Sequence, residues 1–135
     1  MNTQLTVIIP VFNEINSIEQ LLIKVLNNKI DKQIIVVDDH SSDGTRELLI
    51  NKFKNKVDKI IFHKKNLGKG AAIKSAQKYI IGKYTIIQDA DLEYDPSDYL
   101  SLINEAEKNE FQAVYGSRVL NKNMNTNIKN FSHQI

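Results

Sequence analysis

The stretch that decides the fold is residues 85–93, which read Thr-Ile-Ile-Gln-Asp-Ala-Asp-Leu-Glu. Its apolar start predicts a short buried strand, and acidic side chains follow where that strand ends. Because side-chain direction alternates along an extended chain, Asp89, Asp91 and Glu93 are expected on one side of it. Converging carboxylate oxygens suit a hard divalent cation, Mg²⁺ or Mn²⁺, that keeps open positions for phosphate oxygens. The segment therefore predicts a metal site at a strand end.

Apolar runs alternate with helical patterns along the rest of the chain. Strands are expected at 5–11, 34–37, 57–62, 85–88 and 111–115, and helices at 16–28, 44–53, 70–81 and 96–109. Ser17 and Gln20 have the spacing of a capping box at the start of the first helix. Unbroken apolar strands separated by helices indicate an α/β fold, with a Rossmann-like, mostly parallel sheet and helices on both faces.

Polar residues follow four of the expected strands. They are Asn13 and Glu14, Asp38 and Asp39, Asp89 and Asp91, and the run Gly116-Ser117-Arg118. Right-handed crossovers place the carboxyl ends of parallel strands on one edge of a sheet. Ligands of such sheets bind in the crevice at that edge. The four polar clusters therefore predict a single binding site.

Composition sets the outer limits. The 135 residues suffice for one domain, and 41% apolar with 25% charged residues is ordinary for a globular protein. A net charge of +2 gives no argument for a nucleic-acid partner. The absence of cysteine excludes disulfides and thiolate ligands, and no apolar run is long enough to span a bilayer. We expect a cytoplasmic location, at the inner face of the membrane if the substrate is a lipid.

The end of the chain differs from the rest. Residues 1–120 carry the α/β pattern, whereas residues 121–135 are polar, rich in asparagine and without strand or helix periodicity. We expect a tail that begins a missing C-terminal part. A sheet left with an uncovered edge favours self-association, so a homo-oligomer is expected.

Four segments resemble, in the expected order, the motifs of family 2 glycosyltransferases, which have the GT-A fold. They are residues 7–14, 36–45, 66–72 and 89–91. Residues 114–118 are similar to the subgroup of dolichyl-phosphate mannose synthases and polyprenyl-phosphate sugar transferases. The resemblance implies the donor-binding part of an enzyme that moves a sugar from a UDP- or GDP-linked donor to an acceptor such as a polyprenyl phosphate. The implied reaction is a metal-assisted inverting displacement.

The resemblance also implies roles for individual residues at the acidic segment. Asp91 is expected to be the most direct metal ligand and to act in catalysis, and Asp89 to face the ribose or the metal. Ala90 lies between them at the nucleotide-sugar site. For Glu93 a surface position is as plausible as ligation. A general base is expected only beyond residue 135, and an ionised polyprenyl phosphate needs none.

The nucleotide is expected to meet the ends of the first two strands. A carboxylate accepts hydrogen bonds from a base N–H or a sugar hydroxyl, which suits Asp39 to the base with Asp38 nearby. A capping role at the loop is the alternative for this pair. Pro10, Phe12 and Glu14 are expected beneath the base and ribose, with ordinary core packing as the alternative for Phe12.

Cationic and glycine residues complete the expected site. Gly68 and Lys69 open a helix whose N-terminus favours anions, and Lys69 is either a nucleotide contact or a solvated lysine. Arg118 suits the acceptor phosphate or the donor diphosphate and is assigned to catalysis, with a surface ion pair as the alternative. The three histidines, His40, His63 and His133, share no motif and are predicted to be non-catalytic.

Three other functions remain compatible with the pattern. A nucleotidyltransferase should carry a glycine-rich basic loop where this chain has Asn13 and Glu14. In a receiver domain Asp89 would be the residue that is phosphorylated. That fold has no strand before its acidic pair, whereas this chain has the expected strand at 5–11. A catalytically silent nucleotide-sugar-binding fragment is the third possibility, and activity assays of this chain against a C-terminally extended one would identify it.

Overall fold

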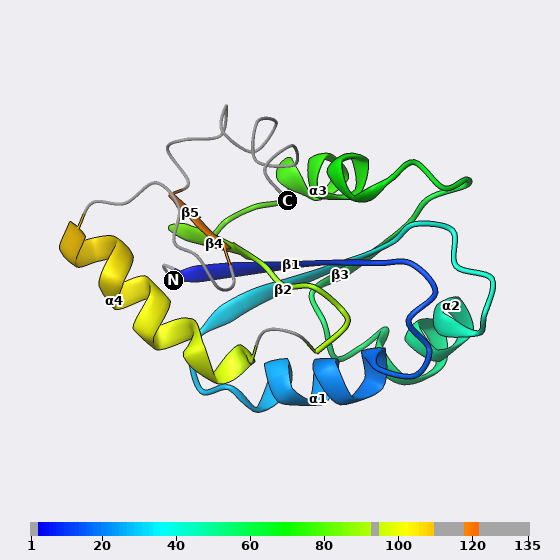
Figure 1. Ribbon diagram of the computed structural model, residues 1–135, viewed down its shortest axis with the longest axis horizontal. Helices are drawn as coiled ribbons and strands as arrows, with labels where there is room; N and C mark the ends of the chain where they lie inside the picture. Colours follow the sequence, from blue (N-terminus) through cyan, green and yellow to red (C-terminus); the bar gives the residue numbers. More distant parts are fainter. Residues whose placement is uncertain (1–2, 93–94, 110–117, 122–135) are drawn as a thin grey trace.

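The computed structural model describes residues 3–92, 95–109 and 118–121 (Figure 1). Five strands form one sheet in the order β3-β2-β1-β4-β5. The strands are β1 (Leu5–Val11), β2 (Lys32–Asp38), β3 (Lys59–Phe62), β4 (Tyr84–Ile87) and β5 (Arg118–Asn121). All pairs are parallel except β4 with β5, which is antiparallel. The mostly parallel sheet confirms the predicted fold class.

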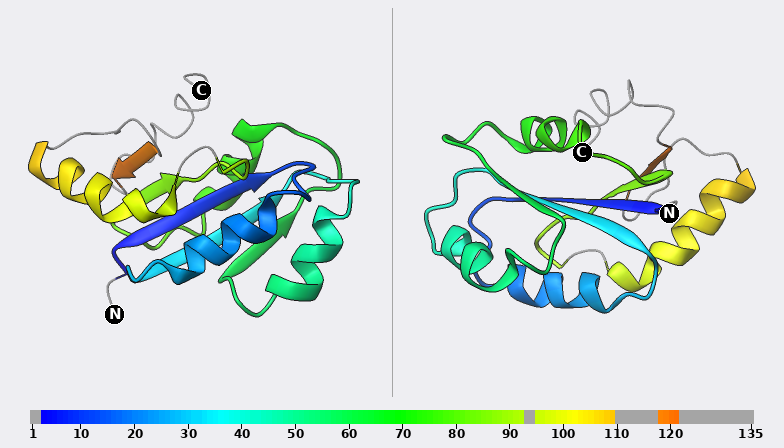
Figure 2. Two further views of the ribbon diagram at one scale, coloured as in Figure 1. Left: turned by 60° about the horizontal axis from the view of Figure 1, so that its bottom comes forward. Right: turned by 180° about the vertical axis from the view of Figure 1, so that it is seen from behind.

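Helices cover both faces of this sheet, as Figures 1 and 2 show. They are α1 (Ile18–Asn27), α2 (Thr45–Leu48) continued by the π-helical η1 (Leu49–Phe53), α3 (Lys69–Gln77), and α4 (Tyr99–Asn109) preceded by the 3₁₀ turn η2 (Pro96–Asp98). Among the described helices, α3 covers one face by itself, while α1, η1 and α4 lie on the other. The sheet is thus buried on both sides.

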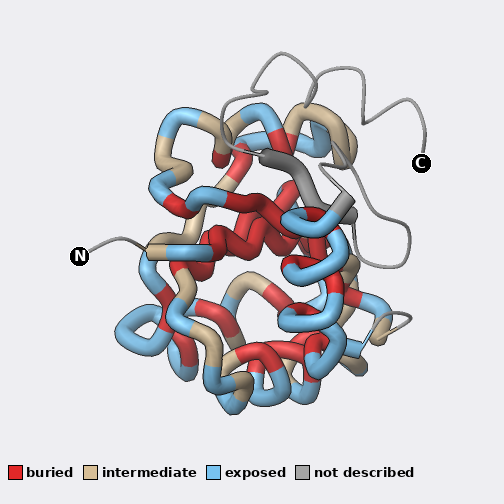
Figure 3. The backbone as a smooth tube through the Cα atoms, turned by 90° about the vertical axis from the view of Figure 1, so that its left-hand side faces the viewer, coloured by how far each residue is buried: buried red, intermediate tan, exposed pale blue. Residues whose placement is uncertain are grey.

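Strand periodicity explains this two-sided core. On β1, Ile8 packs toward α3, whereas Val7 and Ile9 pack toward α1 and α4. All three side chains are fully buried, in keeping with unbroken apolar strands in parallel sheets. Figure 3 shows the buried residues gathered along the sheet and the inner faces of the helices. None of the described helices is long and apolar enough to cross a membrane.

Several local predictions differ from the structure. The expected helix over 44–53 is a short α-helix that widens into a π-helix, and the third helix ends at Gln77 instead of 81. The capping box is wrong, because Ser17 makes no side-chain cap bond and its hydroxyl donates instead to the Ala90 carbonyl at 2.7 Å. A tertiary partner has displaced the local one.

The last strand also departs from prediction. The strand expected at 111–115 lies outside the described residues, and the structure has a strand that was not expected, β5 at Arg118–Asn121. Arg118 is therefore part of a strand, instead of following one. Its backbone pairs with Ile87, the last residue of β4, which places Arg118 at the edge of the sheet where the acidic segment begins.

Candidate functional site

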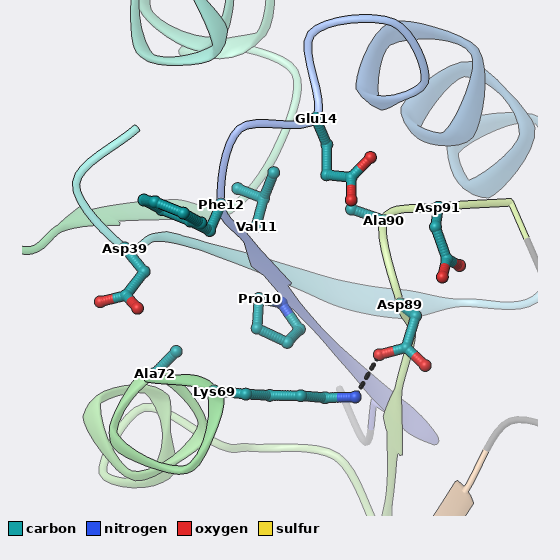
Figure 4. A pocket seen from close by; sticks show the side chains of 10 residues that line it. All are labelled: Pro10, Val11, Phe12, Glu14, Asp39, Lys69, Ala72, Asp89, Ala90 and Asp91. Atoms are coloured by element: carbon teal, nitrogen blue, oxygen red, sulfur yellow. Dashed lines mark hydrogen bonds and ion pairs between the residues drawn. The ribbon is translucent and has the colours of Figure 1, made fainter. Parts of the chain in front are cut away.

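A cavity of about 270 Å³ opens at the carboxyl ends of β1, β2 and β4. Ten residues line it: Pro10, Val11, Phe12, Glu14, Asp39, Lys69, Ala72, Asp89, Ala90 and Asp91 (Figure 4). The chain runs from β1 outward to β2 and β3, and then returns to place β4 on the other side of β1. The cavity therefore lies at the topological switch point, where ligands of open α/β sheets bind.

The loop after β1 is fixed by the loop after β2. Asn13 adopts a left-handed conformation with φ of 52°. Its backbone N–H donates to the Ser41 hydroxyl at 2.9 Å, and its side-chain oxygen accepts from the Ser42 N–H at 2.7 Å. The Asp43 side chain accepts from the N–H of Thr45, two residues further along the chain, and also from the N–H of Ile15. Hydrogen bonds to the loop after β2 thus hold the loop after β1, which forms part of the cavity wall.

Asp39 is held in place by hydrogen bonds from three other residues of the chain. Its side chain is buried and accepts three hydrogen bonds of 2.8 Å each. Oδ1 accepts from the Leu67 N–H and the His63 Nδ1–H, and Oδ2 accepts from the Gly68 N–H. Gly68 has φ of 94°, a conformation that favours glycine. The carboxylate therefore holds the loop that leads into α3.

These bonds stabilise the ionised form of Asp39. Burial alone opposes ionisation of the carboxyl group, but the hydrogen bonds from Leu67, His63 and Gly68 together outweigh it. The pKa of Asp39 is consequently held below its usual value. At neutral pH this side chain is an acceptor only, and two carboxylate oxygens offer about four acceptor positions in total. One position on Oδ2 remains after the three bonds within the chain.

The opposite end of the cavity is acidic, and Lys69 is the one cation among the described residues that line it. Asp89 and Asp91 follow β4, and Figure 4 shows both carboxylates at the end of the cavity away from Asp39. Lys69, the first residue of α3, extends across the cavity floor and forms an ion pair with the Asp89 carboxylate. The Lys69 and Asp89 side chains are 33% and 25% exposed, so solvent reaches this pair. Its two members can separate more easily than a buried pair could.

The acidic segment is tied to the β1–α1 loop through a serine. The Ser17 hydroxyl lies 2.7 Å from the Ala90 carbonyl and 3.0 Å from Glu14 Oε2. On the other side, Gln88 is fully buried and accepts from the Tyr99 hydroxyl at 2.7 Å. These contacts orient the backbone on which Asp89 and Asp91 stand. The backbone at Asp89 and Asp91 is therefore held in place by contacts on both sides.

The remaining predicted residues have three different outcomes. Phe12 is 44% exposed on the cavity wall, so its alternative as ordinary core is wrong. Asp38 does not line the cavity; it is fully buried and accepts from the Ser41 N–H at 3.1 Å. Gly68 contributes its N–H to Asp39 instead of lining the cavity. Glu93 lies outside the described residues, and for Arg118 the structure describes the backbone alone.

His63 was missed by the sequence-based reasoning as a residue of this region. The imidazole is 7% exposed, and its two nitrogens contact Asp39 and Ser75 at 2.8 Å. Its partners lie 24 and 12 residues away along the chain, so no local motif marks it. His40 has left-handed backbone and is exposed, and His133 lies outside the described residues.

Comparison with known proteins identifies the family. A model described as glycosyl transferase family 2 matches residues 6–134. The chain belongs to this family. Dolichyl-phosphate β-glucosyltransferase of Dictyostelium discoideum is 34% identical over 132 residues, and the match covers 87% of this chain and 40% of that protein. Family membership argues against the nucleotidyltransferase and receiver-domain alternatives.

Solved structures support the same fold. The mannosyltransferase PcManGT of Pyrobaculum calidifontis, in complex with GDP-Man and Mn²⁺, matches with a TM-score of 0.65 and 25% identity over 75% of this chain and 31% of its own. Residues 1–349 of S. aureus TarS, in complex with UDP-GlcNAc, match with a TM-score of 0.64 and 25% identity over 77% of this chain and 32% of that one. The fold is therefore the GT-A fold. The chain spans less than half the length of each of these proteins.

The acids of the cavity fit a divalent cation. Asp89 and Asp91 offer carboxylate oxygens, the ligands that Mg²⁺ and Mn²⁺ prefer. Within residues 3–92, 95–109 and 118–121, no three histidine or acidic side chains converge as a complete metal cage. A two-carboxylate site of this kind leaves coordination positions for water and for a substrate diphosphate. The donor set therefore suits a metal that is shared with a substrate.

Proposed function

We propose that this chain binds a nucleotide diphosphate-sugar and supplies the donor site of a hexosyltransferase. The observation that carries the proposal is the composition of the cavity. At one end lies Asp39, a carboxylate that hydrogen bonds within the chain already hold in place. At the other end lie two carboxylates, Asp89 and Asp91, and Lys69. A nucleotide diphosphate-sugar has matching ends, namely a base with N–H donors and a diphosphate that binds cations.

At the base end, Asp39 accepts a ring N–H of the nucleobase through its remaining acceptor position. Uracil and guanine carry such an N–H, whereas N3 of cytosine is an acceptor and would face the carboxylate unfavourably. The half-exposed ring of Phe12 offers a face against which the base or ribose packs. Pro10 and Glu14 line the adjacent wall. Asp38 acts indirectly, by holding the loop at Ser41.

At the diphosphate end, Asp89 and Asp91 hold Mg²⁺ or Mn²⁺, with Glu93 as a further candidate. The bound metal supplies Lewis-acid stabilisation of the charge that the leaving diphosphate gains. Lys69 exchanges its partner: it neutralises Asp89 in the free protein and turns to the diphosphate when the donor arrives. Arg118, the first residue of β5 and paired with Ile87 at the end of β4, is the further cation that we assign to the diphosphate or the acceptor phosphate.

The acceptor we favour is a polyprenyl phosphate. Support comes from the 34% identical dolichyl-phosphate β-glucosyltransferase and from residues 114–118, which resemble that subgroup. An ionised phosphate oxygen attacks without a general base, and attack opposite the leaving diphosphate inverts the configuration of the sugar. A lipid acceptor places the reaction at the cytoplasmic face of a membrane. The second candidate is donor binding without transfer by this chain, because it spans 40% of its relative.

Calorimetry tests the proposal. UDP and GDP are titrated into the chain with Mn²⁺, with Mg²⁺ and with EDTA, and at least one nucleotide should bind much more tightly when metal is present. Equal affinity with and without metal would remove Asp89 and Asp91 from the donor site. Release of UDP or GDP from the matching sugar donor, in the presence of a short-chain polyprenyl phosphate, then separates transfer from silent binding.

A further inference from the structure

His63 occupies a buried position between two parts of the fold. It directly follows β3, and its backbone N–H donates to the Asp38 carbonyl at 2.9 Å, which extends the β2–β3 ladder by one residue. The ring is 7% exposed. Nδ1 lies 2.8 Å from Asp39 Oδ1, and Nε2 lies 2.8 Å from the Ser75 hydroxyl on α3. A buried ring with both nitrogens engaged has a fixed orientation.

The direction of the Asp39 bond follows from the acid. An ionised carboxylate only accepts, so Nδ1 must carry the proton and donate to Asp39. Nε2 then has two ways to meet Ser75. It either accepts from the hydroxyl, or donates to it while that hydroxyl donates to the Ala71 carbonyl 3.0 Å away. In both arrangements Nδ1–H points at Asp39.

The serine, histidine and aspartate follow the order of a hydrolytic triad, but their placement gives a different role. Ser75 lies within α3 and is not among the residues that line the cavity. Asp39, by contrast, lines it. Asp39 is therefore the member of this network that faces the cavity, and Ser75 holds the His63 ring from the opposite side.

The orientation of the Asp39 carboxylate determines which ligand group can bond to its remaining acceptor position. His63 and Leu67 occupy Oδ1 and Gly68 occupies one position of Oδ2, so the remaining position has a single direction. Without the imidazole donor, only the Leu67 and Gly68 N–H groups would hold the carboxylate, and Oδ1 would offer a second vacant position. A base with an acceptor nitrogen could then be accommodated through water. Selectivity among bases thus depends on a group outside the cavity wall.

We propose that His63 is a specificity-determining positioning residue. By donating Nδ1–H to Asp39, it fixes the carboxylate for bases that present a ring N–H and against cytosine. The proposal rests on the proposed function, because it takes the base to lie against Asp39. It adds a residue that neither the cavity lining nor the sequence motifs indicated.

Two amide substitutions separate the two ring contacts. His63→Asn places an N–H donor near the position of Nδ1 and loses the Ser75 contact, whereas His63→Gln reaches toward Ser75 and loses the donor to Asp39. Ser75→Ala is the matched control, since it removes the far support and leaves Nδ1 in place. Each variant is titrated with UDP, GDP and CDP in the presence of Mn²⁺. Amide hydrogen exchange at Leu67 and Gly68 is measured without nucleotide.

The expected result is a loss of selectivity that global stability does not explain. In His63→Gln, discrimination against CDP should fall about tenfold, the worth of one hydrogen bond to a charged group. Exchange at Leu67 and Gly68 should rise in the same variant. His63→Asn and Ser75→Ala should retain most of the discrimination and the protection, even if both lower the melting temperature. Native protection and selectivity in His63→Gln would overturn the inference.

The two readouts also distinguish this inference from the proposed function. If the unsubstituted chain binds all three nucleotides equally, the base contact at Asp39 fails and the selectivity claim falls with it. Protection lost in His63→Gln and kept in His63→Asn would still support the positioning of Asp39 by His63. If the unsubstituted chain discriminates and His63→Gln discriminates equally well, the inference alone fails.

Discussion

The two ends of the cavity are built differently although both present carboxylates. Asp39 is 4% exposed and receives three hydrogen bonds from its own chain, two of them from backbone N–H groups. Asp89 is more exposed and pairs with the end of a long, flexible lysine side chain. A rigid acceptor suits a partner recognised by shape, such as a base. A replaceable counter-ion suits a partner that brings its own charge, such as a metal-bound diphosphate.

This contrast has an energetic meaning. Each donor held by Asp39 would be left without its partner if the carboxylate moved, which costs about 1–3 kcal/mol per buried group. Separation of Lys69 from Asp89 costs much less, because exposed ion pairs contribute about 0–1 kcal/mol and water replaces the lost contact. We therefore infer that donor binding rearranges the diphosphate end and leaves the base end as it is.

Substitution of Asp91, the proposed metal ligand, should give the largest effect and would directly test the exchangeable end of the cavity, the end that contains Asp89, Asp91 and Lys69. We expect Asp91→Asn to abolish the metal-dependent part of nucleotide binding, a loss of at least about 100-fold, since even residues that only support metal ligands are worth 10- to 100-fold. Calorimetry with Mn²⁺ and with EDTA measures it. Asp98→Asn, an exposed acid on η2 outside the cavity, is the control. Metal-dependent binding that survives in Asp91→Asn would place the metal elsewhere.

Substitution of the rigid acid should affect both binding and folding. Asp39→Asn places an amide N–H against the N–H of Leu67, His63 or Gly68, so we expect stability to fall by about 1–3 kcal/mol. Nucleotide affinity should fall about 10- to 100-fold even in EDTA. Urea unfolding and calorimetry measure the two effects. Asp58→Asn is the control, because Asp58 holds the Ile34 N–H at 2.7 Å far from the cavity and should cost stability alone.

The acid dependence of stability has a definite sign for Asp39. Its pKa in the folded chain lies below the ordinary value, so the ionised form stabilises the fold above about pH 4, the pKa expected after unfolding. That contribution is lost as the pH falls through the lower folded value. Asp39→Asn should therefore show a flatter decline of stability between about pH 5 and pH 2. A decline as steep as that of the unsubstituted chain would mean that other carboxyls dominate.

Removal of the Lys69 charge should change the affinities for nucleotide diphosphate and for the metal in opposite directions. Lys69→Met keeps a long side chain and removes the charge, so nucleotide diphosphate should bind about tenfold more weakly. Mn²⁺ alone should bind about fivefold more tightly, because Asp89 no longer carries a counter-ion. Manganese titration followed by electron paramagnetic resonance measures the second change. Lys74→Met, an exposed position on the same helix, should change neither; weaker manganese binding in Lys69→Met would contradict the exchange.

The same contrast separates what could be predicted from sequence from what could not. Asp39, Asp89 and Asp91 were predictable because an apolar run followed by an acid is a local pattern, and parallel strands bring such ends together. His63 was not, because its role arises from contacts 24 and 12 residues away. The Ser17 hydroxyl likewise bonds 73 residues away. Local spacing carries no information on such partners.

Strand β5 shows a second limit. Its four residues, Arg-Val-Leu-Asn, are too few and too polar to give a periodic signal, and their antiparallel pairing with β4 is decided by the edge that β4 presents. Four residues paired along one edge owe their conformation to the neighbouring strand more than to their own propensity. The roles proposed for Arg118 thus depend on a placement that only the assembled sheet provides.

The smallest effect is expected at the cavity wall, where we propose that Phe12 packs against the base or ribose. Its ring is 44% exposed, so Phe12→Ala should leave the melting temperature almost unchanged. Loss of an aromatic contact is worth about 0.5–1.5 kcal/mol, so nucleotide affinity should fall about three- to tenfold. The fall should be equal for UMP and UDP, or for GMP and GDP, because the ring acts on the nucleoside and not on the diphosphate. Ile23→Ala, 47% exposed on α1 and outside the cavity, should leave affinity unchanged. A loss confined to the diphosphates would instead place Phe12 beside the exchangeable end.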